Sequence, residues 1–252
     1  GSVFLFPHPV KELADFLKGH GMHINYDAAH VAGLIAGGKF QDPLREGTDT
    51  MTMSTHKTLF GPQGGLVLGF EKHAEPIKKA MFPGLTSSHH IHHMGAKAVA
   101  FAEALEFGKD YAEQTIKNAK ALASELNNVG FKVLGEKRGY TESHQTVVNV
   151  LDYGDGGTIE ADLEKANIIV NRQLIPGDLK AGRHYMHPGG IRLGTSEITR
   201  LGMKESEMKE IASLMKQVIV DKKDAGEIAA HVKEFKTDFK KTQYCFDNKL
   251  GA

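Results

Sequence analysis

Short apolar segments alternate with helical ones through the first part of this 252-residue chain, and this alternation limits the folds open to it. Strands are predicted over residues 3–6, 22–27, 48–54 and 64–70. The apolar spacing of residues 9–19 predicts an amphipathic helix, and a short helix is expected near 73–79. Strands and helices in this order predict an α/β sheet whose ligands bind at the strand ends.

The pattern changes after about residue 105, where helical segments dominate. The predicted helices cover 111–130, 157–167 (with Thr158 as its cap) and 204–220, and the predicted strands cover 131–135, 146–151, 168–171 and 190–195. This succession predicts a second, smaller α+β domain, joined to the first by a helix over 92–107. We therefore expect domains over 1–105 and 106–252. The lysine-rich segment 222–242 is expected to be a solvated amphipathic helix.

The composition excludes several classes of protein. Lys plus Arg equals Asp plus Glu at 31 each, so the chain lacks the charge excess of proteins that bind nucleic acid or acidic membranes. A single cysteine, Cys245, excludes an internal disulfide framework and fits a reducing compartment. No apolar run is long enough to span a bilayer, and no signal peptide is visible. We expect a cytoplasmic protein without nucleic-acid or membrane partners.

Lys57 has a specific setting in the segment STHKTLFGPQGG, residues 54–65. It follows an apolar strand and precedes a glycine-rich turn, and crowding of this kind lowers the pKa of a lysine by desolvation. A neutral lysine amine is a nucleophile toward aldehydes, and the usual aldehyde is pyridoxal phosphate, which enzymes hold as a Schiff base. This cofactor also requires a carboxylate at its pyridine nitrogen and backbone N–H groups at its phosphate.

Other residues meet these requirements in order along the chain. Asp27 closes the predicted strand in YDAAH, 30 residues before Lys57, and the turn GPQGG follows the lysine directly. Far downstream, Arg192 lies between glycines in GGIRLGTS, where an arginine can bind a substrate carboxylate bidentately. Each residue alone has an ordinary structural explanation as a cap or surface group. Their combination and order favour a pyridoxal phosphate site.

Five segments carry a resemblance to the serine hydroxymethyltransferase family: YDAAHVAGLIAGG, STHKTLFGPQGG, FPG…HHMGAKAVAFAEAL, IIVNRQLIP and GIRLGTSEITRLGMKE. Family members are longer at the amino-terminal end, so the chain resembles their C-terminal portion, and its variations look more like those of archaeal members. The resemblance implies an α/β fold: the C-terminal part of the large domain of a fold-type I pyridoxal-phosphate-dependent transferase, followed by a small α+β C-terminal domain.

The resemblance implies a role for each residue that matches a family motif. Lys57 would form the Schiff base, and Asp27 would pair with the pyridine nitrogen. His30 would form a hydrogen bond near the phenolic oxygen of the cofactor, and His56 would lie beside it. Arg192 would bind the carboxylate of the amino acid. The other residues expected to contact the cofactor are Ser2, Ser54, Thr55, Gly64, Gly65, Ser87 and Ser88.

Four positions depart from the family pattern. Ser87 and Ser88 lie where many members have a glycine pair whose N–H groups bind the phosphate of the neighbouring subunit. Gln63 replaces an arginine, and Gln173 takes the place of an asparagine near the pterin site. This last change suggests that the one-carbon carrier is tetrahydromethanopterin in place of tetrahydrofolate, and Gln173 is expected to contact it.

The implied reaction is the reversible transfer of the hydroxymethyl carbon of serine to a reduced pterin, which leaves glycine. The resemblance also implies a homodimer. Family members contribute an acid–base glutamate, tyrosines and a ring-stacking histidine from an N-terminal part, and those motifs have no match here. We therefore expect this chain by itself to be catalytically poor or inactive.

Two alternatives remain open. The chain can belong to another fold-type I enzyme, such as a threonine aldolase or an aminotransferase, although the STHKTL signature argues against this. It can also be a non-catalytic fragment in which His89, His90, His92 and His93 bind zinc or nickel. Structural zinc sites usually draw their ligands from two segments, so a polar role for this run is favoured and no metal ligand is assigned.

Overall fold

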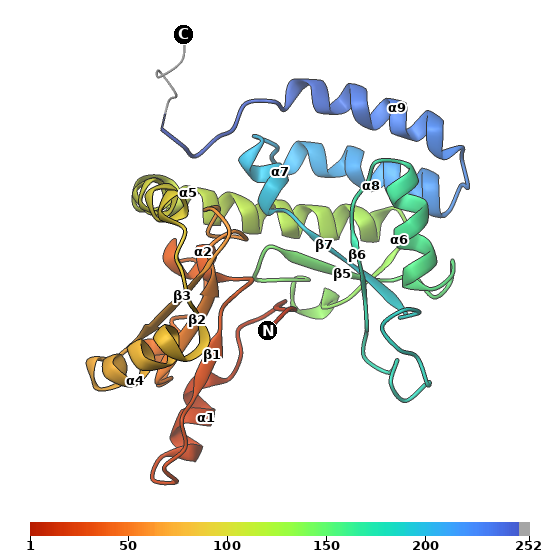
Figure 1. Cartoon of the computed structure of the whole chain (residues 1–252). Helices are drawn as coiled ribbons and strands as arrows, with labels where there is room; N and C mark the ends of the chain where they lie inside the picture. The colour runs from red at the N-terminus through yellow and green to blue at the C-terminus, as the bar shows by residue number, and fades with distance from the viewer. Residues whose placement is uncertain (247–252) are drawn as a thin grey trace. The chain divides into compact units, whose positions relative to one another are not determined.

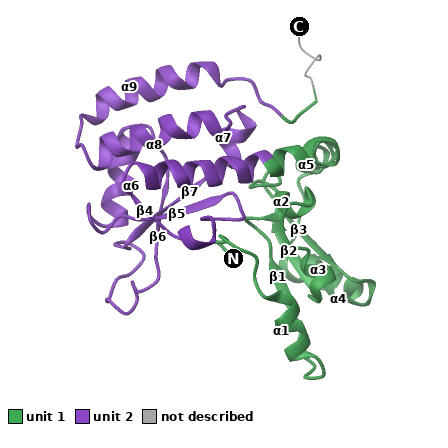
Figure 2. Cartoon of the chain, turned by 180° about the vertical axis from the view of Figure 1, so that it is seen from behind, with its two compact units in different colours: residues 1–113, 244–252 green, residues 114–243 purple. Residues whose placement is uncertain are grey.

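The computed structural model describes residues 1–246, which form two compact units (Figures 1 and 2). Unit 1 comprises residues 1–113 and the described residues from Tyr244 onward, and unit 2 comprises residues 114–243. The sequence predicted a division after residue 105, and the last six residues of its second domain, 247–252, lie outside the described residues. The assignment of a cofactor domain and a small domain stays a prediction.

Unit 1 is built on a three-stranded sheet, in which β1 (Asn25–Asp27), β2 (Thr50–Ser54) and β3 (Gly65–Gly69) lie in the order β1-β2-β3. Strands β1 and β2 are parallel, whereas β3 is antiparallel to β2. The side chains of β2 alternate between threonine and methionine, and Met51 and Met53 are buried. The strands predicted at 22–27, 48–54 and 64–70 are therefore confirmed, with shorter bounds.

The strand predicted over residues 3–6 is wrong, because this segment pairs with no strand. Its apolar character has a different cause. Phe4 is only 2% exposed, and its ring packs against the rings of His8 and Tyr26 at centroid distances of 4.7 and 5.9 Å. Phe4 therefore packs against β1 through its ring. The apolar composition of the segment alone did not distinguish it from a strand.

The helices of unit 1 are mostly short. Asp42 caps α3 by accepting a hydrogen bond from the N–H of Arg45, and Gly47 ends that helix with a φ of 118°. Helices α2 and α3 were not predicted, because four or five residues are too few to show a helical period. The helical segments are α1 (Val10–Leu17), α2 (Ala32–Ala36), α3 (Pro43–Glu46), η1 (Glu71–His73), α4 (Ala74–Lys79) and the irregular turn η2 (Ala80–Leu85).

The longest helix, α5 (Ile91–Asn128), has 38 residues and contributes to both units. The sequence predicted two helices here, over 92–107 and 111–130, and the structure joins them without a break. Gly108 lies inside the helix, and its backbone is in close contact with Gly37 at the end of α2. A β-carbon on Gly37 would lie 2.5 Å from the carbonyl oxygen of Gly108.

Unit 2 contains an antiparallel four-stranded sheet in the order β4-β5-β7-β6. Its core includes Leu126, Ile159, Ile191 and Met215, which are almost fully buried, and each such side chain contributes roughly 1.5–3 kcal/mol. The elements are β4 (Lys132–Val133), η3 (Glu136–Arg138), β5 (Gln145–Asn149), α6 (Gly156–Lys165), β6 (Asn171–Gln173), β7 (Gly190–Gly194), α7 (Ser196–Arg200), α8 (Glu205–Ile219), α9 (Ala225–Phe235) and η4 (Lys236–Asp238).

Two details of unit 2 differ from the sequence prediction. The strand expected at 168–171 lies three residues later, at β6, where Asn171 pairs with Arg192. The cap of α6 is Asp155 and not Thr158, because the Asp155 carboxylate accepts hydrogen bonds from the N–H groups of Gly157 and Thr158. In residues 1–246, no helix has the length and apolar character needed to cross a membrane.

Candidate functional site

Asp27 and Lys57 come to the same edge of the unit 1 sheet. Asp27 is the last residue of β1, and Lys57 lies three residues beyond Ser54, the last residue of β2. Because β1 and β2 are parallel, their carboxyl ends meet at one edge. The positive charge of Lys57 is close enough to lower the pKa of Asp27. The structure thus brings together the two groups that the sequence predicted to act together.

Two neighbours favour the charged form of the Asp27 carboxylate. Burial raises the pKa of Asp27, whereas the hydrogen bond from the Ala29 N–H and the positive charge of Lys57 lower it. The Ala29 nitrogen lies 3.0 Å from Oδ1 of Asp27. The side chain is 52% exposed, so a ligand can reach it.

Hydrogen bonds fix the loop that carries Lys57. The buried Thr55 donates its N–H to the carbonyl of Gly64 at 2.9 Å and its hydroxyl to the carbonyl of Pro62 at 2.7 Å. The Gly64 N–H in turn donates to Nδ1 of His56 at 3.4 Å. Lys57 is half-buried and His56 is exposed. The two side chains therefore belong to a loop between the end of β2 and the start of β3, and hydrogen bonds within the loop hold its backbone in place.

A second set of contacts joins this loop to α2. The hydroxyl of Thr58 donates to the carbonyl of His30 and accepts from the N–H of Gly33, both at 2.9 Å. A β-carbon on Gly33 would lie 1.9 Å from the carbonyl oxygen of Thr58. Gly33 is therefore required for the close approach of α2 to the Lys57 loop. The sequence did not single out Thr58 or Gly33, although both lie inside the segments that carry the family resemblance.

Arg192 and Gln173 belong to unit 2, on neighbouring strands β7 and β6. Arg192 lies opposite Asn171, and its Nη2 donates to Oδ1 of Asn171 at 3.1 Å. Since residues two apart share a face of a strand, Gln173 and Arg192 lie on the same face of this sheet. Burial lowers the pKa of the Arg192 guanidinium, which Tyr185 partly offsets. A half-buried arginine of this kind is suited to binding a carboxylate.

The remaining residues that were predicted to contact the cofactor lie either next to the Lys57 loop or at exposed positions of unit 1. Ser54 and Gly65 lie opposite each other where β2 and β3 begin to separate, close in sequence to Thr55 and Gly64. Ser2 is exposed at the beginning of the chain.

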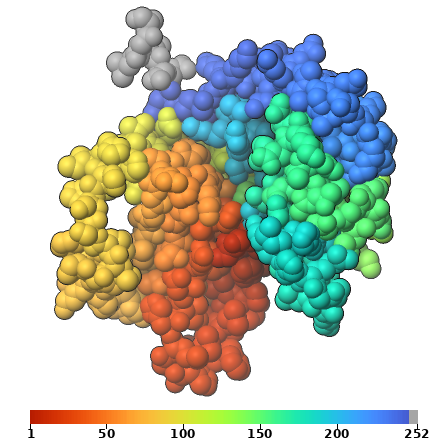
Figure 3. Space-filling model, turned by 45° about the vertical axis from the view of Figure 1, so that its right-hand side comes forward, coloured from red at the N-terminus to blue at the C-terminus, as the bar shows by residue number. Residues whose placement is uncertain are grey.

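Ser87 and Ser88 are exposed and lie in a segment, residues 80–92, whose every residue is exposed. We call this segment the arm. Figure 3 shows it in yellow, separated from the orange surface of unit 1 by an opening.

The histidine run follows Ser88 directly in the chain and lies mostly in the arm. The rings of His90, His92 and His93 approach one another to centroid distances of 4.4–5.5 Å at the start of α5. Within residues 1–246, three metal-ligating side-chain atoms come within 4.8 Å of one another in a different group, which does not include this run. A cavity of about 200 Å³ in unit 2, lined by residues such as Leu122 and Val232, contains none of the predicted site residues.

Comparisons with known proteins identify the same family that the sequence motifs resemble. A sequence model of the family described as serine hydroxymethyltransferase matches residues 8–215. A protein of that name from Nitrosopumilus maritimus is 77% identical over 252 residues, which cover 100% of this chain and 57% of the relative. A protein of the same name from Pyrococcus horikoshii is 53% identical over 254 residues, covering 98% of this chain and 59% of the relative. The chain therefore spans a little over half the length of these relatives.

A solved structure gives the corresponding result for the fold. The crystal structure of an L-threonine transaldolase from Pseudomonas fluorescens, in its internal aldimine state, has a TM-score of 0.87 and 34% sequence identity. The match covers 98% of this chain and 56% of the transaldolase chain. The predicted fold class is thus confirmed: the chain has the α/β fold of part of a fold-type I pyridoxal-phosphate-dependent transferase.

Gly33→Ala should disturb the Lys57 loop. The added methyl group would overlap the backbone of Thr58, and overpacking of this kind costs about 1–3 kcal/mol of the free energy of unfolding. The control is Gly95→Ala in α5, where a β-carbon meets nothing within 4 Å and helix propensity predicts a gain of about 0.5–1 kcal/mol. Urea unfolding measures both changes. Equal stability of the two variants would contradict the close contact.

Proposed function

Because the chain belongs to the serine hydroxymethyltransferase family, we propose that it carries the lysine, carboxylate and arginine of an enzyme that transfers the hydroxymethyl carbon of serine to a reduced pterin. The observation that carries this proposal is the placement of Lys57 and an ionised Asp27 at one edge of the sheet. Pyridoxal phosphate, when bound, supplies an electron-withdrawing ring that weakens the bonds at the α-carbon of an amino acid.

The residues at this edge fit that cofactor. Lys57 provides the amine that binds the aldehyde of the cofactor. Asp27, ionised at neutral pH, holds a proton on the pyridine nitrogen of the cofactor. His30 and His56 are proposed to act beside it. His30 is held through its backbone by Thr58, and His56 through Nδ1 by the Gly64 N–H. Further proposed contacts are Ser2, Ser54, Thr55, Gly64, Gly65, Ser87 and Ser88.

Unit 2 is proposed to bind the substrates. Arg192 binds the carboxylate of serine or glycine. A carboxylate that accepts two hydrogen bonds from one guanidinium has a fixed orientation, and this fixes the direction of the bonds at the α-carbon. Gln173, on the same face as Arg192, is proposed to contact the pterin. Tetrahydromethanopterin is proposed over tetrahydrofolate as the carrier, because Gln173 takes the place of an asparagine near the pterin site. Exchange of labelled serine and glycine in the presence of each pterin distinguishes the two carriers.

The 252 residues by themselves are proposed to turn over serine poorly. They span 57% of the N. maritimus relative, and the resemblance assigns an acid–base glutamate and a ring-stacking histidine to a part of the family sequence that they do not match. A cytoplasmic location stays a prediction from the composition. Tests of activity therefore use the full-length protein that contains this chain.

A second copy of the chain is proposed to cover the arm. Phe82, Leu85 and Ile91 are exposed, with fractions of 66–82%, and Met81 is also on the surface. Proteins that work as monomers rarely expose so many apolar side chains in one segment. The resemblance implies a homodimer in which residues of this segment, here Ser87 and Ser88, bind the phosphate in the neighbouring subunit.

Threonine aldol chemistry is a second candidate. It is favoured by the fold match to an L-threonine transaldolase, an enzyme whose name indicates action on a β-hydroxy amino acid. The identity of that match is 34%, against 50–77% for relatives named serine hydroxymethyltransferase. Cleavage of threonine that exceeds pterin-dependent turnover of serine in the full-length protein would favour the aldolase.

Borohydride reduction of the protein with pyridoxal phosphate should attach one cofactor to each chain, at Lys57. The reason is that Asp27 lies near Lys57, where its carboxylate can pair with the pyridine nitrogen of the bound cofactor. Lys57→Ala should abolish this labelling, whereas Lys209→Ala, on the exposed face of α8, should leave it unchanged. Peptide mapping by mass spectrometry locates the label. Label distributed over many surface lysines would contradict the assignment.

Arg192→Lys should raise the KM for serine by roughly ten- to a hundredfold, with a smaller effect on kcat. Lysine cannot form the bidentate contact, and a hydrogen bond to a charged group contributes about 1.5–3 kcal/mol. Steady-state kinetics of the full-length protein measure both constants. Cofactor labelling of Lys57 is the internal control and should not change. An unaltered KM would remove Arg192 from the substrate site.

Leu85→Asp should reduce the dimer fraction measured by sedimentation velocity, because a charge on the arm would be buried against the second copy. The matched control is Leu179→Asp in unit 2, since Leu85 and Leu179 are exposed to similar extents, 82% and 76%. The control should leave sedimentation unchanged. A Leu85→Asp protein that sediments like the unmodified one would show that the arm is not the interface.

A further inference from the structure

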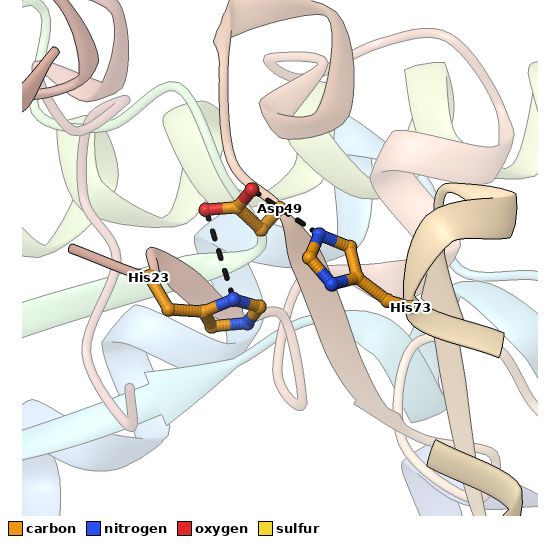
Figure 4. Close-up of side chains that lie close together, drawn as sticks. All are labelled: His23, Asp49 and His73. Carbon is orange, nitrogen blue, oxygen red and sulfur yellow. Dashed lines mark hydrogen bonds and ion pairs between the residues drawn. The ribbon is translucent and has the colours of Figure 1, made fainter. Parts of the chain in front are cut away.

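His23, Asp49 and His73 meet at the edge of the unit 1 sheet opposite to Asp27 and Lys57. His23 precedes β1, Asp49 immediately precedes β2, and His73 follows β3 as the last residue of η1. Asn25 is paired with Thr50 and Thr50 with Gly69, so the starts of β1 and β2 and the end of β3 lie side by side. Figure 4 shows both imidazole rings directed toward the Asp49 carboxylate.

The spacing of the three groups suits one metal ion. Nε2 of His73 lies 3.3 Å from Oδ1 of Asp49, and Nδ1 of His23 lies 3.8 Å from Oδ2. All three ligand atoms lie within 4.8 Å of one another. A tetrahedral ion with bonds of about 2.0–2.1 Å holds its ligand atoms about 3.3 Å apart. A small movement of the exposed His23 ring is therefore enough to close the site.

The hydrogen bonds around His23 leave its Nδ1 without a proton in the neutral ring. Asn25 donates its amide to Thr52 Oγ1 at 3.3 Å, which directs Asn25 Oδ1 toward Thr50. The Thr50 hydroxyl donates to this oxygen at 2.9 Å, so its own oxygen accepts from Nε2 of His23, also at 2.9 Å. In the neutral ring Nδ1 then presents a lone pair to the Asp49 carboxylate, and either a bound metal cation or a proton on Nδ1 can bridge these two acceptors.

The Asp49 carboxylate is fixed and charged. The Ile24 N–H donates to Oδ2 at 3.0 Å, and this bond is the largest influence that lowers the pKa of Asp49. Burial opposes it, but the hydrogen bonds from Lys72 and His73 add to the lowering, so the pKa lies below its ordinary value. Lys72 is the competitor for the site, with Nζ 3.3 Å from Oδ1. Its side chain is 66% exposed and can move into solvent when another cation binds.

We propose that His23, Asp49 and His73 bind a divalent first-row transition-metal ion of the zinc class, with water completing its coordination. Two imidazoles and a carboxylate are ligands typical of such ions. The three ligands come from three segments, so the ion would tie the starts of β1 and β2 to η1 and stabilise this edge of the sheet. The proposal does not depend on the proposed enzymatic function, because the site lies at the other edge of the sheet.

The competing explanation is an ionic network in which protonated histidines and Lys72 surround Asp49 without a metal. The two explanations predict opposite effects of Lys72→Gln. A metal site should bind zinc more tightly when the competing ammonium is removed, whereas a network needs Lys72 and gains no zinc affinity from its loss. Thr50→Val removes the hydroxyl that orients His23, keeps a β-branched residue in β2, and should weaken zinc binding about ten- to a hundredfold.

Zinc binding to the chelator-treated full-length protein, measured by calorimetry and metal analysis, tests the proposal. His73→Ala should remove one bound zinc per chain. The variant His90→Ala/His92→Ala controls for binding by the histidine run and should retain this zinc. Cofactor labelling of Lys57 should be the same in the unmodified protein, His73→Ala and Lys72→Gln, which separates this test from that of the proposed function.

Three results would overturn the proposal. The first is equal zinc stoichiometry and affinity for the unmodified protein and His73→Ala. The second is loss of the zinc in the His90→Ala/His92→Ala variant alone. The third is unchanged or weaker zinc binding by Lys72→Gln, a result that also decides the matter if His73→Ala fails to fold.

Discussion

The parallel pairing of β1 with β2 is the interaction on which both candidate sites depend. It aligns Asn25 with Thr50 and Asp27 with Thr52, so the residues after the two strands converge at one edge and the residues before them at the other. Asp27 and Lys57 meet at the first edge, and His23 and Asp49 at the second. A shift of this register by one residue would turn the side chains of β2 to the opposite face and separate both pairs.

Once the strands are paired, small side chains and single hydroxyls place the loops. Thr58 links the Lys57 loop to His30 and Gly33, and Thr50 orients His23 on the opposite side of the sheet. Gly33 permits the approach that Thr58 needs, because any side chain there would overlap the loop backbone. Rigid strands with loops locked by buried threonines are suited to holding reactive groups at fixed separations.

The sequence predicted the elements whose period extends over several residues. Strands β2, β3, β5 and β7 and helix α8 were found because alternation or helical spacing is visible in each. It missed α2 and α3, which are too short to show a helical period in the sequence. It also predicted a strand over residues 3–6, where Phe4 is buried by ring contacts and not by strand pairing. It also divided α5 into two helices, whereas the structure continues the helix through Gly108.

By itself, the sequence determined which residues are proposed to carry the chemistry. A lysine between a strand and a glycine-rich turn, an aspartate at a strand end and an arginine between glycines are recognisable because each lies within a short local motif. Only the tertiary structure decided which distant groups meet. The histidines at positions 89, 90, 92 and 93 were considered as metal ligands and not assigned as such. Among the described residues, the ligand atoms of His23, Asp49 and His73, which span 50 residues of chain, lie within 4.8 Å of one another. Metal ligands are selected by distance in space, and strand pairing sets that distance.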